Sequence, residues 1–295
     1  MVPVLASEGP RRHNLLVRTK GSPKVEGKDP MAQYDNRYAQ STPARTGVAI
    51  DEGLRAYMLQ VYNYMTAGIA LTGIVAYMVF SYAVTTDPAL AVKSATGATL
   101  ALHRGMYLTP LGYAIYASPL KWVVMLAPLA FVFFLSFRIY KMSVSGAQIA
   151  FWLFAAAMGV SLSSIFLVYT GQSITQVFFV TAAAFGGLSL YGYTTQRDLS
   201  GWGSFLIMGV IGIIVAGLVN LFLQSSALQF AISVIGVLVF AGLTAYDTQR
   251  IKDGYYEVAG NATAATKAAI MGALNLYLDF INMFVMLLQL FGNRE

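Results

Sequence analysis

The chain has 295 residues, of which 57% are hydrophobic and 11% charged, against about 45–50% and about 25% in typical soluble domains. It contains no cysteine, which excludes disulfide frameworks, thiolate metal sites and cysteine nucleophiles. The net charge is +6, nine of the 19 Lys and Arg residues precede Met58, and no later basic stripe is interleaved with aromatic residues. The composition therefore predicts an integral membrane protein, with the lipid bilayer rather than nucleic acid as its partner.

The N-terminal segment, residues 1–56, is rich in proline and charge and has no apolar run long enough for a helix core or a signal peptide. We predict a disordered basic tail over these residues. Met31 opens the stretch MAQYDNRYAQ, which leaves open whether residues 1–30 are an upstream extension of the reading frame. Residues 57–292 are predicted to form a single all-α membrane domain.

Seven apolar stretches, each suited to crossing about 30 Å of hydrocarbon, follow the tail and predict a bundle of seven transmembrane helices. They are expected at residues 58–84, 121–137, 147–169, 174–193, 203–223, 227–246 and 268–291. Within the third stretch, Ala155, Gly159 and Ser163 lie four residues apart. Small residues at that spacing allow two helices to approach closely in lipid.

The distribution of cations predicts the orientation. Alternate loops on the side of the tail contain Arg138, Lys141, Arg197, Arg250, Lys252 and Lys267. On the opposite side, two short loops, residues 170–173 and 224–226, contain no Lys or Arg, and one long loop contains Lys93, Arg104 and Lys121. Because positively charged loops stay in the cytoplasm, we expect a cytoplasmic N-terminus.

The last stretch contains an acidic residue where hydrocarbon is expected. A charged side chain at that depth costs about 2.5–3.5 kcal/mol on insertion scales. Asp279 shares one helix face with Asn275, Asn282 and Gln289, which lie at i−4, i+3 and i+10. Two interpretations remain: these polar groups pin the helix to its neighbours through hydrogen bonds, or they form a functional site.

A second acidic residue closes the sixth stretch. Asp247 lies in the string AGLTAYDTQRIK, so Arg250 and Lys252 follow it, and it fits either a solvated interface residue or a functional one. The sixth and seventh helices run in opposite directions and are expected to be joined by a loop of about twenty residues, so their inner halves can be neighbours. Two adjacent carboxylates cannot both ionise cheaply, and would share a proton. The pair Asp247 and Asp279 then predicts a proton-sensitive latch or a weak site for a hard cation such as Ca²⁺.

The run LNLYLDFINMFVMLLQLFG in the last stretch, with AYDTQ in the sixth, resembles the Bax inhibitor-1 family over residues 58–292. The resemblance implies a seven-helix bundle in which Asp247 and Asp279 form a pH sensor and, as in bacterial members, a calcium leak across the inner membrane. It also implies an arginine near the inner end of the second helix that pairs with the aspartates. Arg138 is the nearest match and Lys141 is its rival, and both also fit ordinary positive-inside anchors.

The sequence leaves three functional hypotheses. The first is a pH-sensitive calcium leak, which is not an enzyme and needs no cofactor. The second is a regulatory protein that contacts a membrane protease or a stress-response component; a pull-down from native membranes that survives loss of Asp279 would favour it. The third is an intramembrane aspartyl protease, which Tyr246–Asp247 fits superficially. That class carries Gly-x-Gly-Asp at its second acid, whereas Leu278 precedes Asp279 here, so only cleavage of a transmembrane substrate would support it.

Overall fold

The computed structural model describes residues 43–93, 101–102 and 105–294, with side chains from residue 52 onward. It contains seven helices that are long and apolar enough to cross a membrane, which confirms the predicted seven-helix fold. Residues 1–42 of the tail predicted over residues 1–56 lie outside the described residues. The first helix begins at Pro43, earlier in the chain than residue 57.

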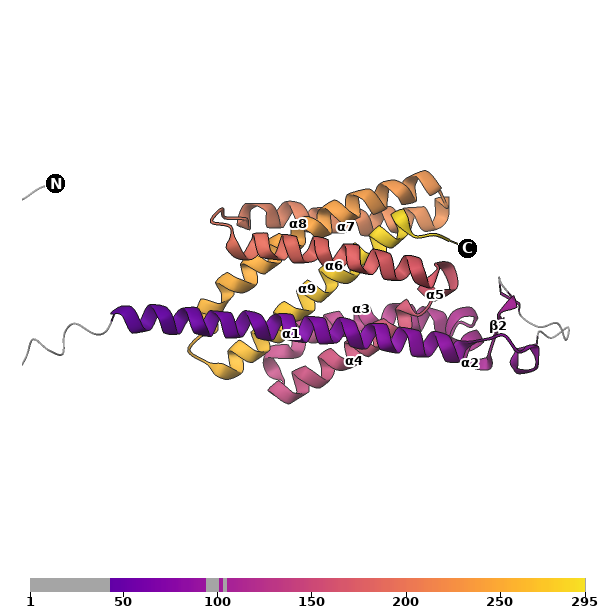
Figure 1. The fold of residues 1–295 in the computed structure, drawn as a ribbon, viewed down its shortest axis with the longest axis horizontal. Coiled ribbons are helices and arrows are strands. Elements are labelled where there is room, and N and C mark those ends of the chain that lie inside the picture. Colours follow the sequence, from indigo (N-terminus) through magenta and orange to yellow (C-terminus); the bar gives the residue numbers. More distant parts are fainter. Residues whose placement is uncertain (1–42, 94–100, 103–104, 295) are drawn as a thin grey trace, which may run out of the picture. The chain divides into compact units, whose positions relative to one another are not determined.

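The membrane-spanning helices alternate in direction, and all but the first two follow one another through short connections (Figure 1). They are α1 (Pro43–Ala83), α3 (Leu120–Arg138), α4 (Val144–Leu162), α6 (Gly171–Thr194), α7 (Ser200–Leu223), α8 (Ser226–Val258) and α9 (Ala262–Phe291). Two short helices extend them, η5 (Ile139–Lys141) after α3 and α5 (Ile165–Val168) after α4.

The connection between α1 and α3 contains short elements of its own. Strand β1 (Val84–Thr85) pairs antiparallel with β2 (Tyr107–Leu108), and a 3-10 turn, η2 (Pro88–Leu90), follows β1. A short α2 (Pro110–Gly112) and the π-helical turn η4 (Tyr113–Ala117) then lead into α3. The Tyr116 hydroxyl of η4 donates a hydrogen bond to Ser163 Oγ at 2.8 Å, so this connection is held against the end of α4.

Helix α9 is the most enclosed of the seven. In its most apolar window 67% of the residues are buried, against 39% or less in the other spans. It packs against α4, α6 and α8, and its Tyr277 ring lies 5.0 Å from that of Phe154 on α4. The Tyr277 hydroxyl shares a hydrogen bond of 2.7 Å with Thr72 on α1. A polar group on α9 is therefore surrounded by protein rather than by lipid.

The sixth span is longer than predicted. Helix α8 continues past Asp247 to Val258, and only Ala259–Asn261 separate it from α9, so the expected loop of about twenty residues is wrong. The helix persists because its last turns keep an apolar contact with α9. Ile251 lies against Gly272, where an added Cβ would be 3.1 Å from Ile251 Cγ2.

The two ends of the bundle differ in charge. We call the end of the bundle that contains the connection between α8 and α9 the basic face, and the opposite end the far face. Among the described residues, the cations at the basic face are Arg55, Arg138, Lys141, Arg197, Arg250, Lys252 and Lys267, and those at the far face are Lys93, Lys121 and Arg294. The excess at one end is the pattern that the positive-inside rule associates with the cytoplasm.

The predicted close contact of small residues occurs between α4 and α1. Ala155 and Ser163 are fully buried, and a Cβ on Gly159 would lie 2.7 Å from the Thr72 carbonyl oxygen. Thr72 Oγ1 donates to the Ala155 carbonyl at 2.8 Å. In lipid, such close backbone approach supplies the van der Waals contact that holds helices together.

We predict that Gly159→Val lowers the thermal stability of the purified protein in detergent. The branched side chain must push α1 away from α4, and overpacking of this kind costs about 1–3 kcal/mol. Gly212→Val is the matched control, because an added Cβ at Gly212 has nothing within 4 Å. Equal denaturation temperatures for the two variants would contradict the α1–α4 contact.

Candidate functional site: an aspartate pair between α8 and α9

One face of α9 is directed at α8. Gly272 and Met286, seven residues to either side of Asp279, contact Ile251 and Gly236 of α8. Residues seven apart lie on nearly the same side of an α-helix, so Asp279 faces α8 as well. Gln289, farther along the same face, accepts hydrogen bonds from Gln229 Nε2 at 2.7 Å and Ser233 Oγ at 2.8 Å, both on α8. The predicted polar stripe thus lies along the α8–α9 interface.

These contacts fix the relative height of the two carboxyl groups. The helices are antiparallel, and Asp279 lies midway between Gly272 and Met286, so it is level with Leu243 and Thr244 on α8. Asp247 is therefore offset by only about 5 Å along the helix axis at 1.5 Å per residue. The offset is about one turn, and Asp247 is the acid nearer to the basic face.

The two acids lie at different depths in the bilayer. Asp247 lies about 31 Å along α8 from Ser226 at 1.5 Å per residue, close to the full hydrocarbon thickness of about 30 Å. It therefore reaches the boundary at the basic face, whereas Asp279 lies about one turn deeper. Asp247 is half-buried and Asp279 is 4% exposed.

Asp279 is incompletely paired. Its Oδ2 atom is buried and has no hydrogen-bond partner in the described part of the chain. Burial is the larger penalty on its charged form, and repulsion from the Asp247 carboxylate adds to it. A buried carboxylate with neither a cation nor a full set of donors is costly, so protonation of the pair relieves both the repulsion and the cost of burial.

Asp247 is held in place by close packing of α8 against α6. A Cβ on Gly192 would lie 2.2 Å from the Ala245 carbonyl oxygen, so only glycine permits this approach. On the other side of Asp247, the Gln249 side chain donates to the Arg197 carbonyl at 2.8 Å and accepts from the Leu199 amide at 2.7 Å. These contacts fix α8 to the turn that connects α6 with α7.

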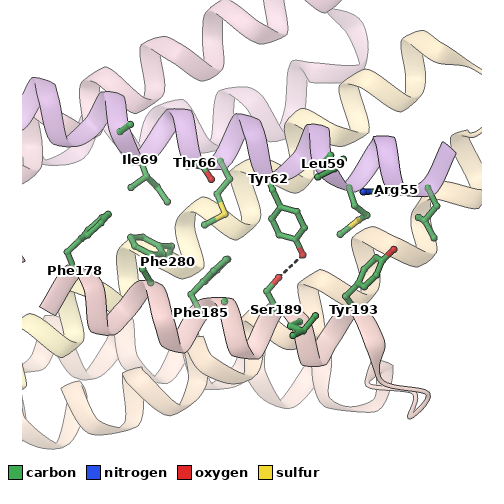
Figure 2. Close-up of a pocket in the computed structure, with 17 residues that line it drawn as sticks. Arg55, Leu59, Tyr62, Thr66, Ile69, Phe178, Phe185, Ser189, Tyr193 and Phe280 are labelled. Atoms are coloured by element: carbon green, nitrogen blue, oxygen red, sulfur yellow. Dashed lines mark hydrogen bonds between the residues drawn. The ribbon is translucent and has the colours of Figure 1, made fainter. Parts of the chain in front are cut away.

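Next to Asp247, a chain of hydroxyl groups crosses from α8 to α1. Thr248 shares a hydrogen bond of 2.9 Å with Ser189 on α6, and Ser189 shares one of 2.7 Å with the Tyr62 hydroxyl on α1 (Figure 2). Sequence reasoning did not single out these three residues. The available signal was the position of Thr248 directly after Asp247 in AYDTQ.

The remaining predicted residues are placed as follows. Asn275 and Asn282 are half-buried on the Asp279 stripe. Arg138 and Lys141 are exposed at the end of α3, and the cation that acts on Asp247 is Arg250 of the same helix. The structure therefore brings together the two aspartates but leaves both candidate latch cations in solvent, and their role stays a prediction.

The donor set suits transient rather than tight cation binding. Among residues 52–93, 101–102 and 105–294, no group of three or more His, Cys, Asp or Glu side chains could hold a metal ion. Ca²⁺ normally takes about six to eight oxygen ligands. The two carboxyls, with nearby hydroxyl and carbonyl oxygens, could contact a passing cation but not enclose it.

Comparison with known proteins places these features in a family. The profile described as "Inhibitor of apoptosis-promoting Bax1" matches residues 54–295. The inner membrane protein YbhL of Escherichia coli is 46% identical over 244 residues, which cover 82% of this chain and 94% of YbhL. A protein of Rickettsia prowazekii is 46% identical over 246 residues, 83% of this chain and 92% of the relative.

A relative from Caulobacter vibrioides is 44% identical over 267 residues, which cover 90% of this chain and all of the relative. The profile match covers most of α1 and all of the helices that follow it, α8 and α9 included. The chain belongs to the Bax inhibitor-1 family of multi-spanning membrane proteins.

Proposed function

We propose that this protein is a pH-sensitive cation leak pathway, with calcium as the cation, in which Asp247 and Asp279 form the proton-sensitive element. The observation that carries the proposal is the buried Asp279 carboxyl, which has an unpaired Oδ2 atom and lies about one helical turn from a second acid. Such a group responds to protonation because, when it is ionised, no partner compensates its charge within the packed bundle.

The position of Asp247 supplies the route for the proton. Asp247 is half-buried at the basic face, and Arg250 lies one turn further along α8 and is exposed. A proton from the aqueous phase reaches Asp247 first and Asp279 through it. When both acids are ionised, their repulsion acts directly on the α8–α9 interface, so a change in proton occupancy shifts the packing of these two helices.

Calcium is the proposed cation because the available ligands are hard oxygens, and because the resemblance to bacterial family members implies a calcium leak. The incomplete donor set is consistent with conduction, since an ion that must leave again cannot be fully enclosed. No step of this proposal requires enzymatic chemistry or a bound cofactor.

We further propose a bacterial inner-membrane location with the basic face in the cytoplasm. The excess of cations at that face supports the orientation, and YbhL of Escherichia coli is named an inner membrane protein. A tag at the N-terminus of the chain that is protected from protease in intact spheroplasts would support this orientation, whereas cleavage from the periplasm would oppose it.

We predict that Asp279→Asn abolishes the pH response of calcium flux in proteoliposomes. The substitution keeps the size of the side chain but removes the titratable group, so flux no longer changes between mildly acidic and mildly basic conditions. Asp253→Asn is the matched control, because Asp253 is exposed on α8. An unchanged pH response in Asp279→Asn would remove the proposal.

We also predict that the two acids are energetically coupled. Because either neutralisation removes the same repulsion, the effects of Asp247→Asn and Asp279→Asn on thermal stability in detergent should deviate from additivity by about 0.5–3 kcal/mol. The pair Asp253→Asn and Asp279→Asn should be additive. Additivity in both double variants would mean that Asp247 and Asp279 do not interact.

A further inference from the structure

A groove of about 910 Å³ opens between α1 and α6, with α9 as its floor (Figure 2). This volume is in the range of about 300–1,000 Å³ that is common for small-molecule sites. Most of the lining side chains are apolar. They include Met58, Met65, Ile69, Phe178, Phe185 and Phe280. The hydrogen bond between Tyr62 and Ser189 crosses the groove near its middle.

The groove has one charged end. Arg55 lies at the basic-face end of the lining, on the same end as Tyr193, whereas Ile69 and Phe178 lie at the other (Figure 2). Lys252 donates to the Tyr193 carbonyl at 3.0 Å and lies 5.9 Å from the centre of its ring. Two cations therefore flank the mouth at the basic face, while the deep part is apolar.

The groove is long enough to span one leaflet of a bilayer. Its α1 wall runs from Leu54 to Ala70, about 24 Å at 1.5 Å per residue, and one leaflet contributes about 15 Å of hydrocarbon, or about 20–22 Å with its headgroup region. A lipid chain that enters beside Arg55 can thus lie along the groove, where it passes the Tyr62–Ser189 hydrogen bond. The guanidinium group matches the geometry of a phosphate, to which it can donate two parallel hydrogen bonds.

From the charged mouth, the apolar depth and the length, we propose that the groove between α1 and α6 binds a phospholipid with an anionic headgroup from the leaflet at the basic face. An acyl chain occupies the apolar part, and Arg55 contacts the phosphate, with Lys252 adding to the positive field. Neither aspartate lines this groove, and the proposal does not depend on the leak function.

Two neighbouring glycines provide a matched test of the groove. Gly186 lines the groove and Gly187 does not, and an added Cβ at either has nothing within 4 Å. Gly186→Phe therefore fills the groove, whereas Gly187→Phe adds the same bulk outside its lining. Ala182→Leu is a milder filling variant should Gly186→Phe fail to fold.

A second pair of variants tests the headgroup contact. Arg55→Gln removes the cation at the mouth of the groove. Arg197→Gln removes an exposed cation at the same face that does not line the groove. The full-length protein in mild detergent is incubated with equal amounts of phosphatidylglycerol and phosphatidylcholine that carry identical chains, and retained lipids are counted by native mass spectrometry.

We expect the wild type, Gly187→Phe and Arg197→Gln to retain phosphatidylglycerol in preference to phosphatidylcholine. Arg55→Gln should reduce that preference about fivefold, the effect of one cation near an anionic lipid surface. Gly186→Phe, or Ala182→Leu, should lose retention of both lipids. Equal lipid retention in Gly186→Phe and Gly187→Phe would overturn the proposal. A preference for phosphatidylglycerol that Arg55→Gln leaves unchanged would overturn it too, as would a groove filled by a second copy of the chain.

Discussion

The repulsion between two carboxyl groups inside a packed helix interface is the constraint on which the rest of the arrangement depends. Asp279 lies on the most enclosed helix of the bundle, and its Oδ2 atom has no partner among the described residues. Proteins bury such groups rarely, because an unpaired acid costs several kcal/mol in a medium of low polarity. Under the proposed function, the free-energy cost of burying the Asp279 carboxyl is what makes the interface respond to protons.

The packing around the pair is close. Glycine and alanine bring α8 against α6 at Gly192 and Ala245, and glycine brings α8 against α9 at Gly236 and Gly272. Close backbone approach excludes lipid and leaves little room for the acids to move apart. A rearrangement that separates Asp247 from Asp279 must therefore shift the segments of α8 and α9 that carry them, and under the proposed function this is how a local charge change alters the packing of the bundle.

Polar contacts are distributed unevenly along the α8–α9 interface. At the far face, Gln289 Oε1 accepts hydrogen bonds from Gln229 and Ser233, and Asn220 Nδ2 donates to Gln229 Oε1 at 3.0 Å. Toward the basic face, the acids lack comparable partners. The interface thus has a hydrogen-bonded end and an end under electrostatic strain, and we expect proton-dependent motion to be confined to the strained end.

Much of this arrangement could be predicted from the sequence. Hydropathy gave the seven spans, because length and composition alone decide whether a helix can cross hydrocarbon. The spacing of Asn275, Asp279, Asn282 and Gln289 placed them on one face, since helical periodicity needs no tertiary information.

Other features depended on contacts between distant segments and could not be predicted. The extension of α8 beyond Asp247 depends on the packing of Ile251 against Gly272. The hydroxyl chain through Ser189 and Tyr62 requires the relative placement of three helices. The exposure of Arg138 depends on how α3 ends: the buried Ile139 follows it, and Lys267 on α9 bonds to the Tyr140 carbonyl.

Infrared spectroscopy of the carboxyl C=O stretch, recorded through a pH titration of the protein in lipid, tests most directly whether the two acids share a proton. We predict a protonated carboxyl band in the wild type that disappears in Asp279→Asn and changes frequency in Asp247→Asn, because the second substitution removes the partner of the bound proton. A band that Asp247→Asn leaves unchanged, in both frequency and pH dependence, would show that Asp279 holds its proton alone and would contradict the paired site.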